Sequence, residues 1–464
     1  MKPIIVWFRQ DLRLADNPAL GFAARSGRPL VCLYILDDET PGNWRWGGAA
    51  RWWLHHSLMA LGKTLNNHKG GRLVLRRGHA GKILKSIAEE IGADMVTWNR
   101  CYEPFAMTRD NVLKQELIND GIAVESFNAS LLFEPWEIAT KQGRPFRVFT
   151  PFWKVLREKT EPGKCHPAPR KLIFHQTVSG DDLGSWKLLP DKPDWAKSFD
   201  WVPGEAAAQR VLSSFVDGIA DYAGARDIPG VDGTSRLSPH LNWGEISPRQ
   251  VWHAAKASPH ARSLGAQAFL KELGWREFCA QLLFHNPDLP EEPFDKRFVK
   301  FPWRDGNDEF RAWTCGETGI PIVDAGMRQL WRTGWMHNRV RMIVASFLIK
   351  HLGIHWKHGE EWFWDTLVDA GLANNAANWQ WVAGSGADAA PFFRIFNPVL
   401  QGEKFDPDGR YVRHFVPELN DISGKYLHHP WDAPTPPRDY PAPIVDLAQG
   451  RMRALKAFKA LGKG

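Results

Sequence analysis

Glu272, Trp275 and Arg276 stand at positions i, i+3 and i+4 of a stretch with helical periodicity that runs from Phe269 to Phe278. On a helix this spacing brings a carboxylate, an indole and a guanidinium onto one face. An exposed ion pair beside a core tryptophan would give the same pattern. The spacing alone therefore permits both a binding face and an ordinary surface.

A second face of this kind is formed by Asn338, Arg341 and Met342, which share the same spacing. An amide, a cation and a thioether together are hard to explain by core packing alone. These residues lie in a segment, 334–390, in which tryptophans stand among Asn, Arg and Asp residues. Because buried polar groups cost free energy unless they find a partner, we expect a polar and aromatic molecule to bind there.

The loop at 233–239 carries three hydroxyls and an arginine ahead of a helical region, namely Thr234, Ser235, Arg236 and Ser238. Hydroxyl and backbone N–H donors in one loop suit a diphosphate. A helix N-cap with a solvated arginine explains the same residues equally well, because hydroxyls are the usual capping groups.

Two further patterns are discounted. Residues 384–390 formally match GxGxxA, but they follow a helical stretch and not a buried strand, so a dinucleotide site is not expected. Several histidines have spacings that a metal could use: His337, His351, His355 and His358. No carboxylate or cysteine completes a ligand set, so capping and surface roles are favoured and no metal is expected.

The amino-acid composition limits the classes of protein to which this chain can belong. The 464 residues suit two or three globular domains, and the formal charge of +7 with a pI of about 9.1 favours an anionic partner without identifying it. Five cysteines form no CxxC pair, which suits a reducing cytoplasm. No apolar run has the length of a membrane span and no signal peptide precedes the first strand-like run. We expect a soluble cytoplasmic protein without a membrane partner.

The elements that must position these residues divide the chain in two. Short apolar runs at 3–8, 29–36, 72–75, 95–98 and 123–127 alternate with helical stretches at 18–26, 48–65, 80–91 and 106–120. This alternation predicts a doubly wound parallel sheet, which can hold a ligand where its strand order reverses. We expect an α/β domain at 1–130, a proline-rich connector of low functional content at 131–202, and an all-helical domain at 203–464. The basic tail from 447 is expected to be a solvated helix.

Several long stretches, in this order along the whole chain, resemble the DNA photolyase and cryptochrome family: 7–20, 233–238, 275–278, 335–342, 379–381 and 393–398. The resemblance implies an α/β domain followed by a helical domain that holds FAD. Residues implied to contact the adenine and diphosphate are Tyr222, Thr234, Ser235, Arg236, Leu237 and Ser238. Arg341 and Asp369 would pair beside the isoalloxazine ring, and Asn375 would face its N5.

The chain is most similar to the bacterial cyclobutane pyrimidine dimer photolyases. That similarity implies light-driven electron transfer from reduced FAD to a dimer flipped out of UV-damaged DNA. The implied contacts with the dimer are Glu272, Trp275, Asn338, Met342 and Trp381. Arg226, Arg339 and Arg394 occupy cationic positions expected at the DNA phosphates, where contacts are salt-sensitive. A monomer that associates with the nucleoid when bound to DNA is expected.

Tryptophan is unusually frequent, with 24 Trp against 6 Tyr, and most of these indoles are expected to fill the core. The resemblance places Trp379, Trp356 and Trp303 at the positions of the family's electron relay, which reduces oxidised flavin. Because all three tryptophans fall at these positions together, a relay is favoured over the alternative that each is an ordinary core residue.

The chain departs from the family pattern in two places. Gly371 stands where a second aspartate is usual, so a carboxylate near the pyrimidine end of the flavin is missing. Phe105 and Ala106 stand where one branch has an Asn–Glu pair for a folate antenna, although a methenyl-folate is still the expected second chromophore. Trp52, Trp53 and the neighbouring GNWRWGG resemble the class III branch.

Two rival functions share this fold. A signalling cryptochrome would use the same flavin, but Glu272, Trp275 and Trp381 favour repair, and no long disordered extension follows the last helix. Repair of six-four photoproducts would use a pair of active-site histidines. Asn338 stands where one of those histidines would be expected.

Overall fold

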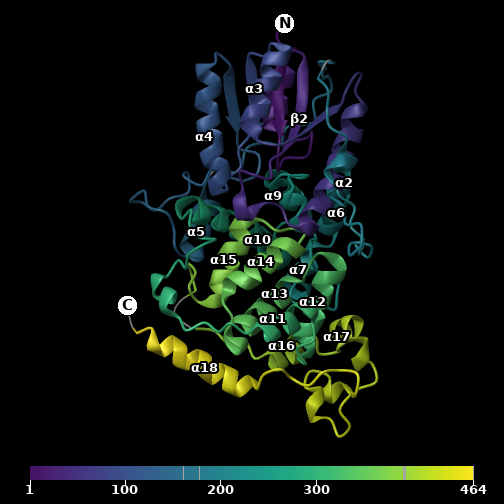
Figure 1. Ribbon diagram of the computed structural model, residues 1–464, viewed down its shortest axis with the longest axis vertical. Helices are drawn as coiled ribbons and strands as arrows, with labels where there is room; N and C mark the ends of the chain where they lie inside the picture. The colour runs from purple at the N-terminus through teal and green to yellow at the C-terminus, as the bar shows by residue number, and fades with distance from the viewer. Residues whose placement is uncertain (160, 177, 390–392, 463–464) are drawn as a thin grey trace.

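The computed structural model describes residues 1–159, 161–176, 178–389 and 393–462. Ala390, the last residue of the 384–390 stretch, and Lys463 and Gly464 of the tail lie outside these ranges. The α/β domain forms one end of the molecule and the helical domain the other, with the last helix running along the far side of the helical domain (Figure 1).

The N-terminal domain is a five-stranded parallel sheet, as the apolar runs predict. Its strands are ordered β3-β2-β1-β4-β5 and span Ile4–Phe8 (β1), Leu30–Leu36 (β2), Leu73–Arg77 (β3), Met95–Asn99 (β4) and Ala123–Phe127 (β5). The helices between them are Pro18–Arg25 (α1), Gly48–Asn66 (α2), Ala80–Ile91 (α3) and Pro104–Asn119 (α4). Every residue of β1 and β2 is buried, which explains why these strands read as continuous apolar runs.

Polar side chains occupy the edge where the strand order reverses, between β1 and β4. Arg9 pairs with Asp110, and Asn99 donates to the carboxylate of Asp11, and all four residues are buried. They therefore lie at the edge where such sheets often hold a ligand.

The second domain is helical, also as predicted. Its helices are Glu205–Asp217 (α6), Tyr222–Ala225 (α7), Ser238–Asn242 (α8), Pro248–Ala257 (α9), Leu264–His285 (α10), Asn307–Cys315 (α11), Pro321–Thr333 (α12), Asn338–Ser346 (α13), Trp356–Thr366 (α14), Leu372–Ala383 (α15), Pro398–Phe405 (α16), Arg410–Phe415 (α17) and Leu447–Ala460 (α18). A π-helical turn, Phe347–Leu352, follows α13. Over the whole chain, short 3-10 turns lie at Gly42–Trp44, Leu183–Trp186, Ile219–Asp221, Lys296–Lys300, Pro417–Leu419, Gly424–Tyr426 and Pro430–Asp432.

The connector contains a helix that the sequence pattern did not predict, Phe149–Glu158 (α5). This helix packs against α10, and the ring of Phe149 stacks on Trp275 with centroids 3.6 Å apart and planes 7° apart. This part of the connector therefore contacts one of the predicted site residues. Prolines on both sides of α5 weakened the periodicity that would have revealed it.

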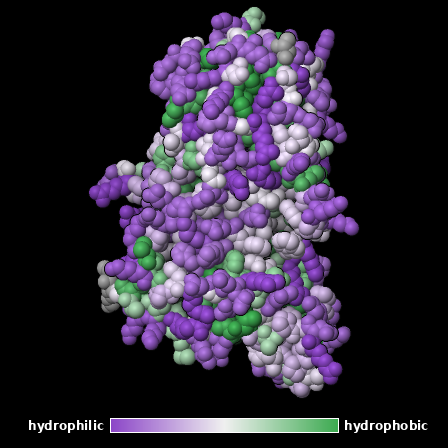
Figure 2. All heavy atoms as spheres, viewed as in Figure 1, coloured by the Kyte–Doolittle hydropathy of each residue, from purple (hydrophilic) through white to green (hydrophobic). Residues whose placement is uncertain are grey.

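The tail helix α18 is solvated on one side only. Gly450 lies against the backbone of His351, where a Cβ would approach the carbonyl oxygen to 2.8 Å, and Phe458 stacks on Phe393 with centroids 4.3 Å apart. The exposed side carries its basic residues. Among the residues that the structure describes, no helix is long and apolar enough to cross a bilayer, and the face in Figure 2 is mainly hydrophilic.

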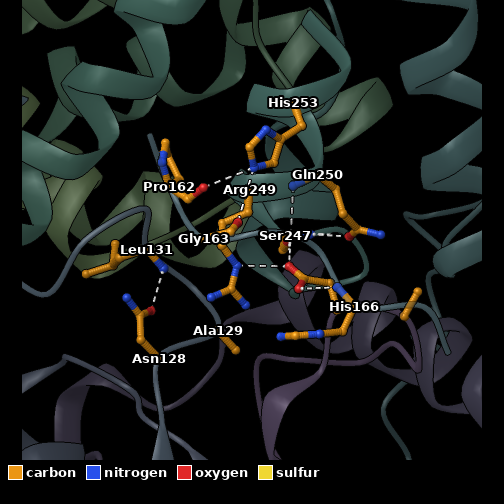
Figure 3. Close-up of polar contacts among 12 residues, drawn as sticks. Asn128, Ala129, Leu131, Pro162, Gly163, His166, Ser247, Arg249, Gln250 and His253 are labelled. Atoms are coloured by element: carbon orange, nitrogen blue, oxygen red, sulfur yellow. Dashed lines mark hydrogen bonds and ion pairs between the residues drawn. The ribbon is translucent and has the colours of Figure 1, made fainter. Parts of the chain in front are cut away.

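A buried carboxylate ties the two domains and the connector together. Asp16, fully buried in the turn after β1, accepts hydrogen bonds from Ser247 Oγ at 2.6 Å and from Arg249 Nε at 3.0 Å. Its other oxygen accepts from the backbone N–H of His166 at 3.2 Å. Figure 3 shows Ser247, Arg249 and His166 converging on this point from α9 and the connector.

We expect Asp16→Asn to lower the free energy of unfolding by about 3 kcal/mol, because it leaves the Arg249 charge, on a side chain only 14% exposed, without its carboxylate partner. Asparagine tolerates the left-handed backbone at this position (φ 50°), so strain does not add to the effect. Urea unfolding followed by tryptophan fluorescence measures the loss. The matched control is Asp232→Asn, which removes an exposed ion pair with Arg236 and should cost less than about 1 kcal/mol. Equal losses in both variants would contradict the role of Asp16.

Candidate functional site

A cavity of about 750 Å³ opens in the helical domain between α7, α8, α10, α13 and α15. Most of the residues singled out in the sequence line it: Tyr222, Arg226, Ser235, Ser238, Glu272, Trp275, Asn338, Arg339, Arg341, Met342, Asp369, Gly371, Asn375, Trp379 and Trp381. Thr234, Arg236, Leu237, Trp356, Trp303 and Arg394 are not among the lining residues. Segments far apart in the sequence thus meet around one space.

An ion pair at the cavity joins Arg341 to Asp369. One nitrogen of the guanidinium, Nη2, donates to both carboxylate oxygens of Asp369, at 3.0 and 2.8 Å. Nε donates to the carbonyl of Met336 at 2.7 Å, which fixes the guanidinium in place. The Asp369 side chain is only 4% exposed, so the ion pair is shielded from water and fixes the position of its charge.

The mouth of the cavity carries two arginines that pair with carboxylates. Arg226 Nη1 donates to Glu272 Oε1 at 2.5 Å, and Arg339 Nη2 lies 2.9 Å from Asp227 Oδ2. Both arginine side chains are partly exposed, at 23% and 20%. They can therefore exchange these partners for an anionic ligand.

Two indoles at the cavity are held in defined orientations. Trp275 stacks on Phe149 of the connector helix α5, and the guanidinium carbon of Arg394 lies 5.5 Å from the ring centre of Trp381. Beside Trp275, Gly274 makes room for Trp153, because a Cβ at this position would lie 2.4 Å from the Trp153 ring. Arg394 does not line the cavity itself, but it contacts Trp381, which does.

The hydroxyl loop does not cap a helix. Leu237 is the N-cap residue of α8 and no side chain caps the helix, so the capping interpretation of this loop is wrong. Leu237 is buried in the core, and the hydroxyls of Ser235 and Ser238 line the cavity. Arg236 is exposed and pairs with Asp232, as a solvated arginine would.

The three tryptophans predicted to form a relay lie between the cavity and the surface. Trp379 is buried and lies directly on α14, because a Cβ at Gly359 would come within 2.1 Å of its ring. Gly359 is one turn after Trp356, which is fully buried. The His355 ring lies 5.4 Å from Trp356 and 4.8 Å from Trp303, which is half-buried.

A carboxyl group that sequence reasoning missed lies behind Asn375. Glu360 of α14 is fully buried, neither of its carboxyl oxygens has a hydrogen-bond partner among the described residues, and its backbone carbonyl accepts from Asn375 Nδ2 at 2.9 Å. Burial raises the pKa of this carboxyl well above its usual range, so the protonated form is favoured. Next to Glu361 in a charged stretch, Glu360 gave no sign of burial in the sequence.

This raised pKa predicts a pH-dependent difference between the protein and its Glu360→Gln variant. The unfolded chain releases the proton at lower pH than the folded chain, so the stability that Glu360 contributes is lost as pH rises toward the folded pKa. Gln stays neutral, so the stability of the variant relative to the unaltered protein should increase between pH 5 and pH 8. Urea unfolding at both pH values measures this difference in stability. The control is Glu361→Gln, because Glu361 is exposed. A pH-independent difference for Glu360→Gln would exclude the raised pKa.

Comparison with known proteins agrees with this architecture. The sequence model of the "DNA photolyase" family matches residues 4–171, and that of the "FAD binding domain of DNA photolyase" matches residues 269–460. A "Deoxyribodipyrimidine photo-lyase" of Agrobacterium fabrum is 54% identical over 99% of this chain and 98% of its own. "Cryptochrome-1" of Arabidopsis thaliana is 37% identical over 98% of this chain and 70% of its own.

The three-dimensional similarity is equally extensive. The crystal structure of a bacterial class III photolyase from Agrobacterium tumefaciens superimposes with a TM-score of 0.95 at 53% identity, covering 99% of this chain and 98% of that one. Both domains and nearly their whole length are thus shared. The chain belongs to the DNA photolyase and cryptochrome family.

Proposed function

We propose that this protein repairs cyclobutane pyrimidine dimers in DNA in a light-dependent reaction, with FAD bound in the cavity. The observation that carries the proposal is that Glu272, Trp275 and Asn338 line the same cavity as the Arg341–Asp369 ion pair. Lesion-binding groups and cofactor-binding groups therefore face a common space. The name of the Agrobacterium relative supports the same reaction.

The residues of the cavity fit FAD. Its volume lies within the range of about 300–1,000 Å³ that is usual for cofactor pockets. Helix α15 begins at the cavity without a side-chain cap, so the N–H groups of its first turn favour negative charge on a bound group. Ser235 and Ser238 would bind the diphosphate and Tyr222 the adenine. Arg341 and Asp369 would lie beside the isoalloxazine ring, and Asn375 would face its N5.

The other residues of the 233–238 loop support these contacts indirectly. Leu237 packs in the core and fixes the loop, so Ser235 and Ser238 are held toward the cavity. Thr234 and Arg236 flank Ser235 and remain candidates for the outer part of the diphosphate.

When bound in its reduced form, FAD would supply the light-driven one-electron chemistry that opens the cyclobutane ring with no net change of redox state. The chain's own contribution is to bind and orient the dimer. Glu272 would hydrogen-bond the flipped bases, while Trp275 and Trp381 would pack against them. Phe149 keeps the Trp275 ring in one orientation, which lowers the entropy cost of stacking.

Met342 and Asn338 complete the lesion site. Met342 lies on the face of α13 that borders the cavity, and its thioether contacts the Arg339 guanidinium at 3.8 Å. Asn338, at the start of the same helix, would contact both cofactor and lesion. The relay from Trp379 through Trp356 to Trp303 would restore the reduced cofactor.

DNA phosphates would be bound by Arg226, Arg339 and Arg394. Arg226 is already paired with Glu272, so a phosphate would have to compete with that carboxylate or be shared with it. Each phosphate that an arginine neutralises releases counterions, so affinity should fall steeply with salt. Binding of UV-damaged duplex at 50 and 200 mM salt measures this dependence.

A second chromophore, a methenyl-folate, is part of the proposal. Phe105 is partly buried against the helical core and Ala106 is buried, so neither position supplies the polar pair found in one branch of the family. Extraction of the purified protein and chromatography of the released chromophores tests the folate directly.

The deciding experiment gives reduced, FAD-loaded protein two oligonucleotides under blue light, one with a cyclobutane thymine dimer and one with a six-four photoproduct. We expect loss of the cyclobutane dimer alone, and only in the light. Loss of the six-four lesion would replace the proposed substrate. No loss of either lesion with FAD bound would favour a receptor of the cryptochrome type.

A further inference from the structure

Gly371 and Asn242 share one small space at the cavity. A Cβ at position 371 would lie 2.7 Å from Oδ1 of Asn242, closer than real Cβ atoms approach an oxygen. The backbone of Gly371 has φ −107° and ψ 126°, which any residue can adopt. A larger residue at 371 would therefore have to displace the side chain of Asn242, although its backbone would not be strained.

The Asn242 amide is held from one side only. Its Nδ2 donates to the carbonyl of Ala370 at 3.4 Å, and its backbone carbonyl accepts from Gln10 Nε2 at 3.3 Å. No donor in the described part of the chain reaches Oδ1. Asn242 lines the cavity together with Asp369 and Gly371, so this oxygen is a free acceptor in the space where the cofactor would bind.

We propose that Asn242 is a cofactor contact that binds the imide edge of the flavin, in the place that a carboxylate at position 371 would otherwise take. An imide presents one N–H donor between two carbonyl acceptors. An amide oxygen with no partner, next to a helix terminus whose N–H groups lack a cap, supplies the acceptor and donors that match this edge. Because residue 371 is a glycine, there is space for the side-chain amide of Asn242. This inference rests on the proposed binding of FAD.

The first test measures FAD affinity of the cofactor-free full-length protein by quenching of flavin fluorescence. Asn242→Ala should weaken binding about fivefold, the effect of one neutral hydrogen bond. With FAD methylated at N3, which lacks the imide donor, Asn242→Ala should cause no loss. An equal loss with both flavins would overturn the contact, because a general structural defect does not depend on the N3 hydrogen.

The second test uses the shared space. Gly371→Ala adds only a Cβ, which should displace the Asn242 amide and weaken FAD binding about as much as Asn242→Ala. The double variant should bind no more weakly than either single variant, because both remove the same contact. Additive losses would overturn the proposal. The control is Asn378→Ala, since this exposed amide lines the cavity but donates within α15 to the carbonyl of Asn374.

The outcomes separate this inference from the proposed function. Protein that binds FAD in the predicted pattern but leaves dimers intact would refute repair and retain the role of Asn242. Protein that binds no FAD would refute both.

Discussion

Replacing Trp379 with phenylalanine is expected to slow light-driven reduction of oxidised flavin by at least about tenfold, the effect of about 1.4 kcal/mol on a barrier. Trp379 is the one proposed relay residue that borders the cavity, and Gly359 allows its ring to lie directly against the helix that begins with Trp356. Phenylalanine keeps most of the packing but is much harder to oxidise than an indole. Absorbance of the flavin during blue illumination with an external reductant measures the rate.

The matched control is Trp313→Phe. Trp313 is equally buried and contacts Trp379 edge-to-face at 6.3 Å, but its indole N–H donates to the carbonyl of Val344 and it is not one of the three relay positions. Its replacement should leave photoreduction within about twofold, since it removes one hydrogen bond and some packing but no proposed relay indole. Repair by protein reduced beforehand should be unchanged in both variants. If Trp379→Phe photoreduces normally, electrons reach the flavin by another route and the assignment fails.

The fold was predictable because its elements carry strong local patterns. Strands buried on both faces give continuous apolar runs such as Ile4–Phe8, and the capping box of Ser247 and Gln250 marks the start of α9. Helix α5 was missed because flanking prolines weaken its periodicity, and no local pattern encodes its contact between Phe149 and Trp275.

The site was predictable where several chemically unusual residues share a helix face, as Asn338, Arg341 and Met342 do. Residues that stand alone in the sequence, without unusual residues on the same helix face, were not predicted. Asn242 ends a short helix and Glu360 adjoins another glutamate, so each is typical of a surface position in the sequence. Only the packing of other segments against them shows that one faces the cavity and the other is buried without a partner.

Removing the positive half of the buried ion pair should have the largest effect on both stability and cofactor binding. Arg341→Leu leaves the Asp369 carboxylate, 4% exposed, without a partner, and we expect the free energy of unfolding to fall by about 3 kcal/mol. FAD affinity should fall by at least about tenfold, because the guanidinium also supplies charge beside the proposed site of the isoalloxazine ring. Urea unfolding and flavin fluorescence measure the two effects separately.

The double variant Arg341→Leu/Asp369→Leu distinguishes structural from functional roles of the pair. Replacing both charges with apolar groups removes the unpaired carboxylate, so most of the lost stability should return. FAD affinity should stay low, since neither charge is left to orient or balance the cofactor. Full recovery of affinity together with stability would show that the pair serves the fold alone. Low stability in the double variant would show instead that the Arg341 hydrogen bond to Met336 carries the structural effect.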